Sequence, residues 1–358
     1  MAEEMNVIDL FAGVGGLSLG FEQEGFKVVL ANEYDASIAD AYVKNRVGAN
    51  MIVADIRDLS VDKTFGKYRG EVRVVIGGPP CQGYSQKGQR RTIHDARNFL
   101  FEYYVKVVEE VQPTYFVMEN VPNLLTNEDG YFKDEIFALF EELGYVVNAE
   151  VLCAADYGVP ENRNRAVIIG RKGDGDPVEM PWKAVDKVTI WDAISDLNYL
   201  KSGEGKPVSP YIIDAQTDYQ REMREGSDAV YGHVATRHSD VALERMAMIP
   251  PKGGKEHLPE HHLTKSIYSG TWERMPADGV SRTITTRFDT PASGQFMHPY
   301  LDRAITVREA ARIQSFPDTF HFYGTKTSQM KQVGNAVPPK LARAIARAII
   351  RDMQMHDE

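Results

Sequence analysis

The stretch that decides the fold is Asn6–Ser18, which reads NVIDLFAGVGGLS. Its apolar half predicts a buried strand over Asn6–Phe11, and the glycines Gly13, Gly15 and Gly16 lead into a helix. A glycine-rich turn between a strand and a helix lets the backbone approach a bound cofactor. The stretch therefore predicts the first strand of an α/β domain, with a ligand site at its carboxyl end.

The same alternation of short apolar runs and amphipathic stretches continues to about residue 170. It is typical of parallel strands connected by helices. We expect the further strands at Lys27–Ala31, Met51–Ala54, Val72–Ile76, Thr114–Met118, Val146–Leu152 and Ala166–Ile169. We expect helices at Asp35–Arg46, Arg97–Val111 and Tyr131–Leu143. The predicted fold is a doubly wound, mostly parallel, Rossmann-like sheet.

A change in the sequence pattern marks a second domain. From about Arg171, Gly- and Pro-rich runs such as KSGEGKPVSP and PPKGGKEHLPEHH break up any long periodicity, which indicates a smaller, loop-rich domain. Helical patterns return at Thr306–Gln314 and Lys340–Met353. We therefore predict a first domain over residues 1–180, completed by 320–358, and a second domain with a hinge over residues 181–319.

Composition limits the class of protein. The 358 residues are 43% hydrophobic and 26% charged, as in folded soluble domains. Two cysteines exclude a disulfide framework, and neither a signal peptide nor an apolar stretch of about 18 residues occurs. We expect a cytoplasmic protein without a membrane partner.

The charge is unevenly distributed along the chain. Residues 1–150 carry 14 Lys and Arg against 24 Asp and Glu, a net charge of -10, whereas residues 151–358 carry 27 of each. The second half is therefore neutral on average, and a polyanion can meet a neutral or basic face there.

The glycine turn suits one kind of cofactor best. Ser18 stands where a dinucleotide site has its third glycine, and a P-loop lysine is missing. Glu33 and Asp55 end the next two predicted strands, where one carboxylate can bind ribose hydroxyls and a second polar group can bind the adenine amine. Phe11 and Tyr34 can flank the adenine ring. A cofactor with adenosine but no pyrophosphate, such as S-adenosylmethionine, fits this set; the alternative is turn glycines and helix-capping carboxylates.

The fourth predicted strand ends in GGPPCQGYS, which contains Cys81. A lone cysteine is more often an inert apolar side chain. This one follows the rigid pair Pro79-Pro80 at the ligand edge of the sheet, where backbone N–H groups can stabilise a thiolate. A zinc deaminase needs a second cysteine three residues later, and Tyr84 stands there.

A carboxylate and two arginines complete the candidate site. Glu119 ends the fifth strand, and the period-two spacing of Arg163 and Arg165 sends both guanidinium groups to one side of the chain. Glu119 can bind or protonate a ring nitrogen, while an arginine can hold a carbonyl oxygen that gains charge. Separately, these residues also fit a strand-end cap and surface ion-pair partners.

Taken together, the motifs resemble those of bacterial-type DNA (cytosine-5)-methyltransferases. DLFAGVGGLSLGFEQEGF, NEYD, GGPPCQGYS, MENVPNLL, ENRNRAVIIG, VREAARIQSFPD and QVGNAVPP follow that family's order across nearly the whole chain. The resemblance implies an S-adenosylmethionine-dependent methyltransferase fold, double-stranded DNA as the partner and a target-recognition domain in about 181–300. It implies no metal.

The resemblance also implies roles for individual residues. Cys81 would attack the cytosine, Glu119 would contact N3 and the amine, and Arg163 and Arg165 would orient the flipped base. The expected cofactor residues are Phe11, Ala12, Gly13, Gly15, Gly16, Leu17, Asn32, Glu33, Tyr34, Asp55, Ile56, Gly78, Pro80, Leu100, Asn335 and Ala336. The expected DNA contacts are Gln82, Ser85, Lys87, Arg90, Arg91, Arg97, Arg237, Arg282 and Arg287. The family often has Gln where Glu161 stands, which leaves the role of that carboxylate open.

Further basic residues of the second half are weaker candidates for DNA contacts, since such charges are more often solvated. They are Arg221, Arg224, Arg245, Lys252 and Lys255. His257, His261 and His262 favour a loop over a metal site, because no cysteine lies near them and Pro259 separates them.

Three rival functions stay open at this point. The tRNA-methylating branch of the family carries a Cys-Phe-Thr signature in its recognition region, and this chain has no cysteine after Cys153. A catalytically silent DNA-binding relative is disfavoured by Cys81, Glu119 and Arg165. An NAD-dependent oxidoreductase is disfavoured by Ser18. We expect a monomer, with a functional link to a cognate restriction endonuclease.

Overall fold

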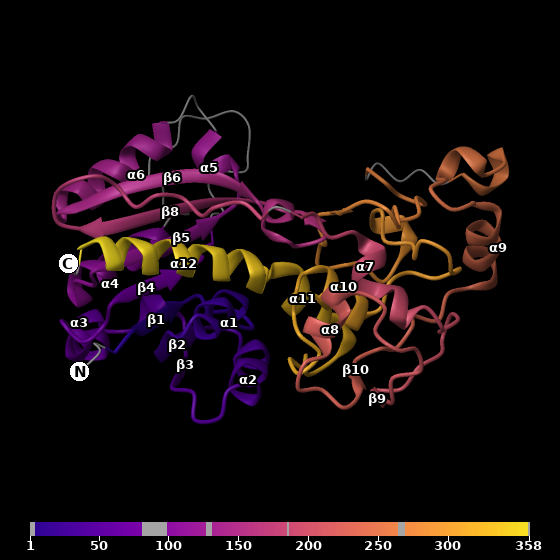
Figure 1. Cartoon of the computed structure of the whole chain (residues 1–358), viewed down its shortest axis with the longest axis horizontal. Coiled ribbons are helices and arrows are strands. Elements are labelled where there is room, and N and C mark those ends of the chain that lie inside the picture. Colours follow the sequence, from indigo (N-terminus) through magenta and orange to yellow (C-terminus); the bar gives the residue numbers. More distant parts are fainter. Residues whose placement is uncertain (1–3, 81–98, 127–130, 185, 264–268, 357–358) are drawn as a thin grey trace. The chain divides into compact units, whose positions relative to one another are not determined.

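The computed structural model describes residues 4–80, 99–126, 131–184, 186–263 and 269–356 (Figure 1). The chain divides into two compact units. The first consists of Met1–Cys153, Asn164–Lys183 and Pro339–Glu358, and the second of Ala154–Arg163 and Ala184–Pro338. Each unit is described by itself below.

The first unit is built on a seven-stranded sheet with the order β3-β2-β1-β4-β5-β8-β6. The strands are β1 (Asn6–Leu10), β2 (Lys27–Glu33), β3 (Met51–Val53), β4 (Val74–Gly77), β5 (Tyr115–Asn120), β6 (Tyr145–Cys153) and β8 (Asn164–Lys172). All neighbours pair in parallel except β8, which is antiparallel to β5 and β6. The prediction of a mostly parallel, doubly wound sheet is confirmed.

The strand order reverses between β1 and β4. From β1 the chain proceeds outward through β2 and β3, then returns to the other side of β1 with β4. At such a switch point the loops after the two central strands separate and leave room for a ligand. The loops that start at Phe11 and Gly78 are the two that lie there.

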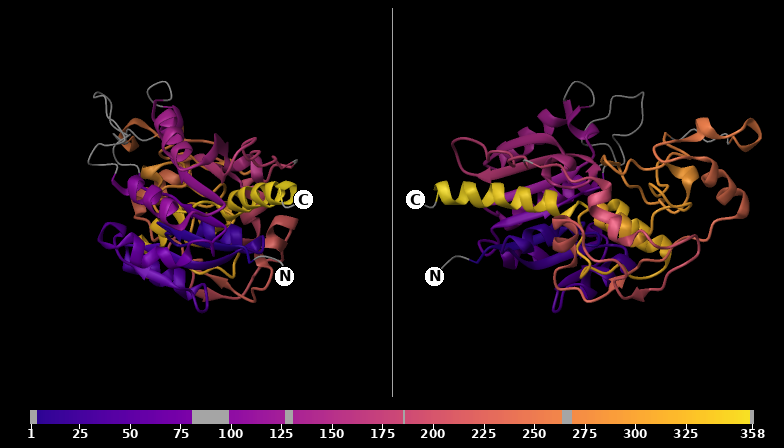
Figure 2. Two further views of the ribbon diagram at one scale, coloured as in Figure 1. Left: turned by 90° about the vertical axis from the view of Figure 1, so that its left-hand side faces the viewer. Right: turned by 45° about the vertical axis from the view of Figure 1, so that its right-hand side comes forward.

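Helices cover both faces of this sheet. They are α1 (Gly16–Gln23), α2 (Ala36–Lys44), α3 (Val61–Phe65), α4 (Phe99–Val111), α5 (Asn123–Thr126), α6 (Tyr131–Glu142) and α12 (Pro339–His356). Figure 2 shows α12 running along the sheet.

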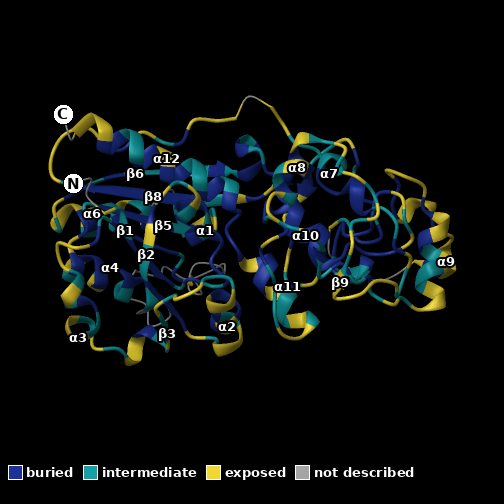
Figure 3. Cartoon of the chain, turned by 60° about the horizontal axis from the view of Figure 1, so that its bottom comes forward, coloured by how far each residue is buried: buried dark blue, intermediate teal, exposed yellow. Residues whose placement is uncertain are grey.

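The alternation of side chains along β5 shows which helices cover which face. Phe116 belongs to the cluster that contains Val108 of α4 and Phe140 of α6, and it stacks on Phe140 with ring centroids 3.9 Å apart. The side chain of the preceding residue, Tyr115, points to the opposite face of the sheet, because side chains alternate along a strand. The Tyr115 hydroxyl donates to Asp352 of α12 at 2.9 Å. The central strands of the sheet are thus buried on both faces, as their dark colour in Figure 3 shows.

Helix α12 packs on α1 through a very close approach. A Cβ atom on Gly20 would lie 2.3 Å from the Cβ atom of Ala342, so only glycine fits at this crossing. Arg343 and Arg347 each reach Glu24 at 2.9 Å. Helix α12 is therefore part of the first unit.

The second unit has short elements joined by long loops. Its helices are α7 (Ile190–Ile194), α8 (Asp218–Arg224), α9 (Asp240–Met248), α10 (Val307–Ile313) and α11 (Lys326–Asn335). Its strands are β7 (Glu161–Asn162), β9 (Val208–Ser209), β10 (Val230–Tyr231) and β11 (Ser281–Arg282). The loop-rich texture expected from the sequence is what the structure has.

The bounds of the two units differ from the predicted division. Residues 154–163 and 320–338 belong to the second unit, and the chain returns to the first at Pro339. Contacts of α11 explain the place of 320–338, because the Gln314 amide donates to the Val333 carbonyl at 2.6 Å and Gly334 packs on the Thr285 backbone. The pairing of β7 with β11 explains that of 154–163.

Candidate functional site

The loop after β1 has an unusual backbone. Phe11, Gly13 and Gly15 have positive φ angles of 56°, 56° and 88°. A positive φ is rare for a residue with a side chain such as Phe11, and such strain clusters at functional sites. A Cβ atom on Gly13 would have no described atom within 4 Å. The glycines thus permit this backbone conformation, and the described atoms leave the space beside Gly13 open.

Glu33, at the end of β2, holds this loop. Its carboxylate accepts hydrogen bonds from the backbone N–H groups of Gly13 and Asp35, each at 2.9 Å. Burial raises the pKa of Glu33, which the hydrogen bonds offset in part. The next residue, Tyr34, is 72% exposed, so its ring is available to a planar ligand.

Asn32 and Asp55 have partners within the protein. The Asn32 side chain donates to the carbonyl oxygens of Ile52 and Ala54 at 3.0 and 2.9 Å, which joins the ends of β2 and β3. Asp55 forms an ion pair with Arg57 at 2.6 Å, and this hydrogen-bonded pairing lowers the pKa of Asp55. Both residues therefore shape the edge of the sheet, whatever further contact they make.

The other predicted cofactor residues are placed as follows. Ala12, Gly16, Leu17 and Ile56 are buried, Leu100 packs partly buried against the main core, and Pro80 is exposed. Asn335 and Ala336 lie at the end of α11, in the second unit. Their contact with a cofactor stays a prediction.

A buried polar chain beneath the loop was not predicted. Ser18 donates to the Asp9 carboxylate, and its oxygen lies 2.9 Å from the Tyr42 hydroxyl. Burial raises the pKa of Asp9 to about 7, although the bond from Ser18 opposes the shift. The Arg46 guanidinium lies 4.1 Å from the centre of the Tyr42 ring and donates to the Gly15 carbonyl at 2.7 Å. The only sequence signal was an aspartate inside an apolar strand.

The turn after β4 is fixed against the end of β5. A Cβ atom on Gly78 would lie 2.9 Å from Glu119 Oε2, and the Asn120 side chain donates to the Pro79 carbonyl at 2.8 Å. The chain then reaches Cys81, which lies outside the described residues together with Gln82, Ser85, Lys87, Arg90, Arg91 and Arg97. The described part of the turn thus places Glu119 next to the residues that lead to Cys81.

Glu119 forms an ion pair with Arg165. Arg165 Nε lies 2.6 Å from Glu119 Oε1, and the two side chains are 15% and 12% exposed. The pairing follows from the sheet, since Glu119 lies opposite Val167 in the antiparallel β5–β8 ladder. A charged hydrogen-bonded pair of this kind fixes the orientation of the carboxylate.

Arg163 has different partners from Arg165. Its guanidinium donates to the carbonyl oxygens of Ile284 and Gly334 in the second unit, at 3.2 and 2.7 Å. The expectation from period-two spacing does not hold, because β7 ends at Asn162 and β8 begins at Asn164. The alternation of a single strand therefore does not extend across Arg163.

The described candidates for DNA contacts lie on the second unit. Arg237 is exposed, Arg282 pairs with Glu273 at 3.2 Å, and Arg287 pairs with Asp289 at 3.3 Å. All three remain available for phosphate or base contacts, because exposed ion pairs are weak.

Arg224 belongs in the interior instead. It donates to Asp196 and to the Ile213 carbonyl, and its guanidinium lies 3.9 Å from the centre of the Tyr211 ring. Its interpretation as a candidate DNA contact is corrected, because a side chain with these partners stabilises the unit.

The motif VREAARIQSFPD forms a buried charge network that sequence reasoning missed. Arg312 pairs with Asp196 at 2.7 Å and with Asp318 at 2.6 Å, all three at 0% exposure. Arg303 pairs with Glu309 at 2.7 Å in the same way. Buried charges are tolerated when they are paired like this. The motif thus holds the second unit together.

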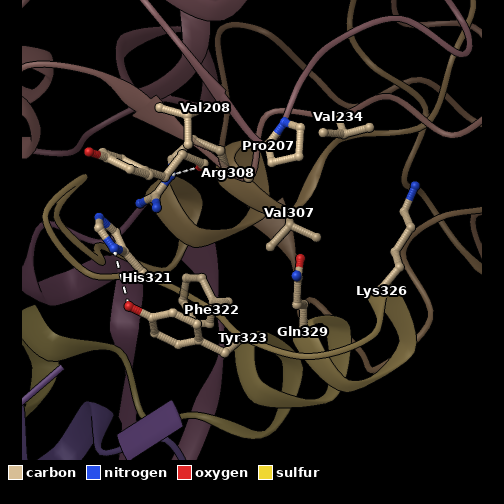
Figure 4. A pocket seen from close by; sticks show the side chains of 12 residues that line it. Pro207, Val208, Val234, Val307, Arg308, His321, Phe322, Tyr323, Lys326 and Gln329 are labelled. Carbon is tan, nitrogen blue, oxygen red and sulfur yellow. Dashed lines mark hydrogen bonds between the residues drawn. The ribbon is translucent and has the colours of Figure 1, made fainter. Parts of the chain in front are cut away.

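A pocket of about 360 Å³ lies in the second unit, beside this motif (Figure 4). Two cations at its wall have partners: Arg308 donates to the Tyr231 and Phe320 carbonyls, and Lys326 donates to the Thr236 hydroxyl at 2.5 Å. It is lined by Pro207, Val208, Tyr231, Gly232, Val234, Val307, Arg308, His321, Phe322, Tyr323, Lys326 and Gln329. Glu119, Arg163 and Arg165 are not among these residues.

The described residues hold no cluster of His, Cys, Asp and Glu suited to a metal ion. No helix among them is long and apolar enough to cross a membrane.

Comparisons with known proteins agree with the motifs. The family described as C-5 cytosine-specific DNA methylase matches residues 5–351. The Type II methyltransferase M.DdeI of Desulfomicrobium norvegicum is 38% identical, over 96% of this chain and 88% of its own length. M1.HphI of Haemophilus parahaemolyticus is 38% identical over 97% of this chain and 87% of its own.

A solved structure extends the likeness to the fold. A protein solved as a candidate DNA modification methyltransferase of an Escherichia coli prophage is 28% identical, has a TM-score of 0.80 and covers 98% of this chain and 100% of its own. The chain therefore belongs to the C-5 cytosine-specific DNA methylases, the enzymes that transfer a methyl group to carbon 5 of cytosine in DNA.

Proposed function

We propose that this chain methylates cytosine within one specific duplex sequence, after flipping the base out of the helix, and that Cys81 forms a covalent bond to C6 during the reaction. The observation that carries the proposal is the Glu119–Arg165 pair at 2.6 Å, beside the Gly78-Pro79 turn that leads to Cys81. A flipped base is required because C6 is inaccessible in a stacked duplex.

S-adenosylmethionine, when bound, supplies an electrophilic methyl group on a sulfonium. The residues present fit it: Gly13 borders open space among the described atoms, and the buried Glu33 carboxylate retains lone pairs that can accept from ribose hydroxyls. The exposed ring of Tyr34 can stack on adenine. A carboxylate also tolerates the positive charge of the sulfonium.

The protein's part in the chemistry follows from three side chains. The Cys81 thiolate adds to C6 while Glu119, which must first take up a proton from solvent, donates that proton or a hydrogen bond at N3, so that electron density collects at C5. Arg165 holds Glu119 and can also bind the cytosine carbonyl oxygen. After C5 has taken the methyl group, the C5 proton passes to solvent, the Cys81 thiolate leaves C6, N3 returns any proton it received to Glu119, and the ring is aromatic again.

The remaining roles follow from charge and position. We propose that the segment after Cys81, with Lys87, Arg90, Arg91 and Arg97, closes over the flipped base and binds phosphates. We propose that the second unit recognises the target sequence, with Arg237, Arg282 and Arg287 among its contacts. A restriction-modification system or epigenetic marking would use such an enzyme, acting as a monomer in a bacterial cytoplasm without a metal.

The test is covalent trapping. 5-Fluorocytosine carries fluorine in place of the C5 hydrogen, and fluorine cannot be lost as a proton. Duplex DNA with this base at the target, incubated with the enzyme and S-adenosylmethionine, should therefore form an adduct that survives denaturation. Cys81→Ser should form none, and bisulfite sequencing of plasmid from a host that expresses each form should show methylation for the wild type alone. An adduct with the variant would refute the role of Cys81.

A further inference from the structure

Two buried side chains hold one peptide segment from both sides in the second unit. Glu161 Oε1 accepts a hydrogen bond from the Ile284 N–H group at 2.5 Å. Arg163 donates to the Ile284 carbonyl at 3.2 Å and to the Gly334 carbonyl at 2.7 Å. The two side chains therefore fix the backbone of Ile284 and tie it to the end of α11.

The burial of this pair is nearly complete. The side chains of Glu161 and Arg163 are 0% and 1% exposed, and Glu161 Oε1 lies 3.6 Å from Arg163 Nη1. A buried guanidinium needs a counter-charge and acceptors. Glu161 supplies the counter-charge, and the two carbonyls accept from Nη1 and Nη2. A guanidinium enclosed in this way acts through the backbone that it binds.

The segment 281–287 presents a polar face on this fixed backbone. Its first two residues form β11, which pairs in parallel with β7. Ile284, within the segment, and Phe288, the residue directly after it, are 0% exposed. Within the segment the exposed side chains are those of Arg282, Thr283, Thr285 and Arg287.

Two more contacts restrict the same segment. The Thr283 hydroxyl donates to the Asn162 carbonyl at 2.9 Å. A Cβ atom on Gly334 would lie 2.4 Å from the Thr285 carbonyl oxygen, so the two backbones are in direct contact. The polar face is thus ordered before any ligand binds, and an ordered surface loses less entropy on binding.

We propose that Glu161 and Arg163 are positioning residues that hold segment 281–287 in the conformation that contacts DNA. This rests on the proposed function, because it assigns the DNA-facing role to that segment. It also gives the Glu161 carboxylate a purpose, as the acceptor for Ile284 and the counter-charge of Arg163.

The test compares Glu161→Ala, Glu161→Gln and Arg163→Lys in the full-length enzyme. Hydrogen exchange without DNA should show faster exchange of the 281–287 amides in Glu161→Ala and Arg163→Lys. Glu161→Gln should keep most of the protection, because its amide oxygen still accepts from Ile284. In methylation assays, Glu161→Ala and Arg163→Lys should raise KM for cognate DNA about tenfold and leave kcat within about twofold.

Two comparisons make the outcome decisive. Arg165→Lys should lower kcat without faster exchange of 281–287. Tyr211→Phe removes a 2.7 Å bond to Asp318 elsewhere in the same unit, so it should lower stability without changing KM for DNA. The proposal is overturned if Arg163→Lys lowers kcat at saturating DNA while the exchange of 281–287 stays as in the wild type. Failure of the proposed function would appear separately, as wild-type enzyme that leaves cytosine unmethylated.

Discussion

Arg165 Nε lies 2.6 Å from Glu119 Oε1, and the two residues come from adjacent antiparallel strands of the first unit. The antiparallel β8 thus brings a cation to a carboxylate at the ligand edge of a sheet whose other strands run in parallel. This geometry fixes one oxygen of Glu119 while the other faces the turn at Gly78.

The first prediction concerns this pair. Glu119→Gln should lower the single-turnover rate of methyl transfer at least about a hundredfold, because an amide cannot donate a proton to N3. Rapid-quench assays with saturating DNA and cofactor measure this rate. Arg171→Lys is the matched control, since Arg171 lies on the same strand but pairs with Asp352 at 3.4 Å. A rate for Glu119→Gln equal to that of the control would exclude acid catalysis by Glu119.

The second prediction concerns the cofactor. Glu33→Ala should weaken S-adenosylmethionine binding by ~1 to 3 kcal/mol, because it leaves buried N–H groups and ligand hydroxyls without their acceptor. Asp55→Ala should have a smaller effect in the same direction, since its carboxylate is paired with Arg57 and partly exposed. Calorimetry measures both affinities.

Asp40→Ala is the control for these variants, because Asp40 forms an exposed pair with Lys44 on α2. Its cofactor affinity should equal that of the wild type. Unchanged cofactor affinity in Glu33→Ala, together with weaker DNA binding, would contradict the assignment.

The third prediction is a pH dependence of stability. Burial raises the pKa of Asp9 from 3.8 to about 7. Between these values the unfolded chain is deprotonated at this position while the folded protein retains the proton, so the free energy of unfolding should fall as the pH rises from about 4 to about 7. Asp9→Asn removes this slope, and chemical denaturation across that range measures the difference. Parallel pH curves for the two proteins would show that Asp9 titrates normally.

The fourth prediction concerns sequence choice. Exchange of residues 184–338 with the matching segment of a relative of known target should transfer the target. The exchange should work better when it includes 154–163, because β7 within that segment pairs with β11. Mapping of methylated cytosines in host DNA reads the outcome. An active chimera that keeps its original target would place recognition in the first unit.

The fifth prediction separates the basic residues of the second unit. Replacing Arg282 or Arg287 by Ala should either cost ~1 to 3 kcal/mol on the cognate site and relax one position, or weaken all sequences alike and reduce the salt slope by ~1. Arg224→Ala should instead lower the melting temperature, since it leaves Asp196 with one cation fewer. Titrations of cognate and unrelated duplexes at several salt concentrations distinguish these results. Loss of DNA affinity in a fully stable Arg224→Ala protein would refute the interior role of Arg224.

Much of the first unit could be predicted from the sequence, because its signals are local. A strand such as β4 is a continuous apolar run that ends at glycines, and α6 repeats apolar residues on one face before Gly144. Parallel strands end at a common edge, so Glu33 and Glu119 could be placed at that edge without coordinates.

The rest depends on partners that are distant in sequence. Arg224 carries the same charge as Arg237, and only the fold brings Asp196 to the former. The separation of Arg163 from Arg165 depends on a strand break that neither glycine nor proline marks. Ser18, read as a missing glycine, proved to be the hydrogen-bond donor of a buried aspartate.

The packing of α12 on α1 has a consequence for how the protein is made. Ala342 fits against Gly20, and Asp352 accepts from Tyr115, so the first unit lacks one covering layer until the last helix has been synthesised. Helix α1 and the seven strands emerge from the ribosome long before α12. In contrast, Ala184–Pro338, which forms most of the second unit, emerges as one continuous stretch. We therefore expect the second unit to be able to fold during translation before α12 has been synthesised, and the first unit to complete its packing only after α12 has emerged.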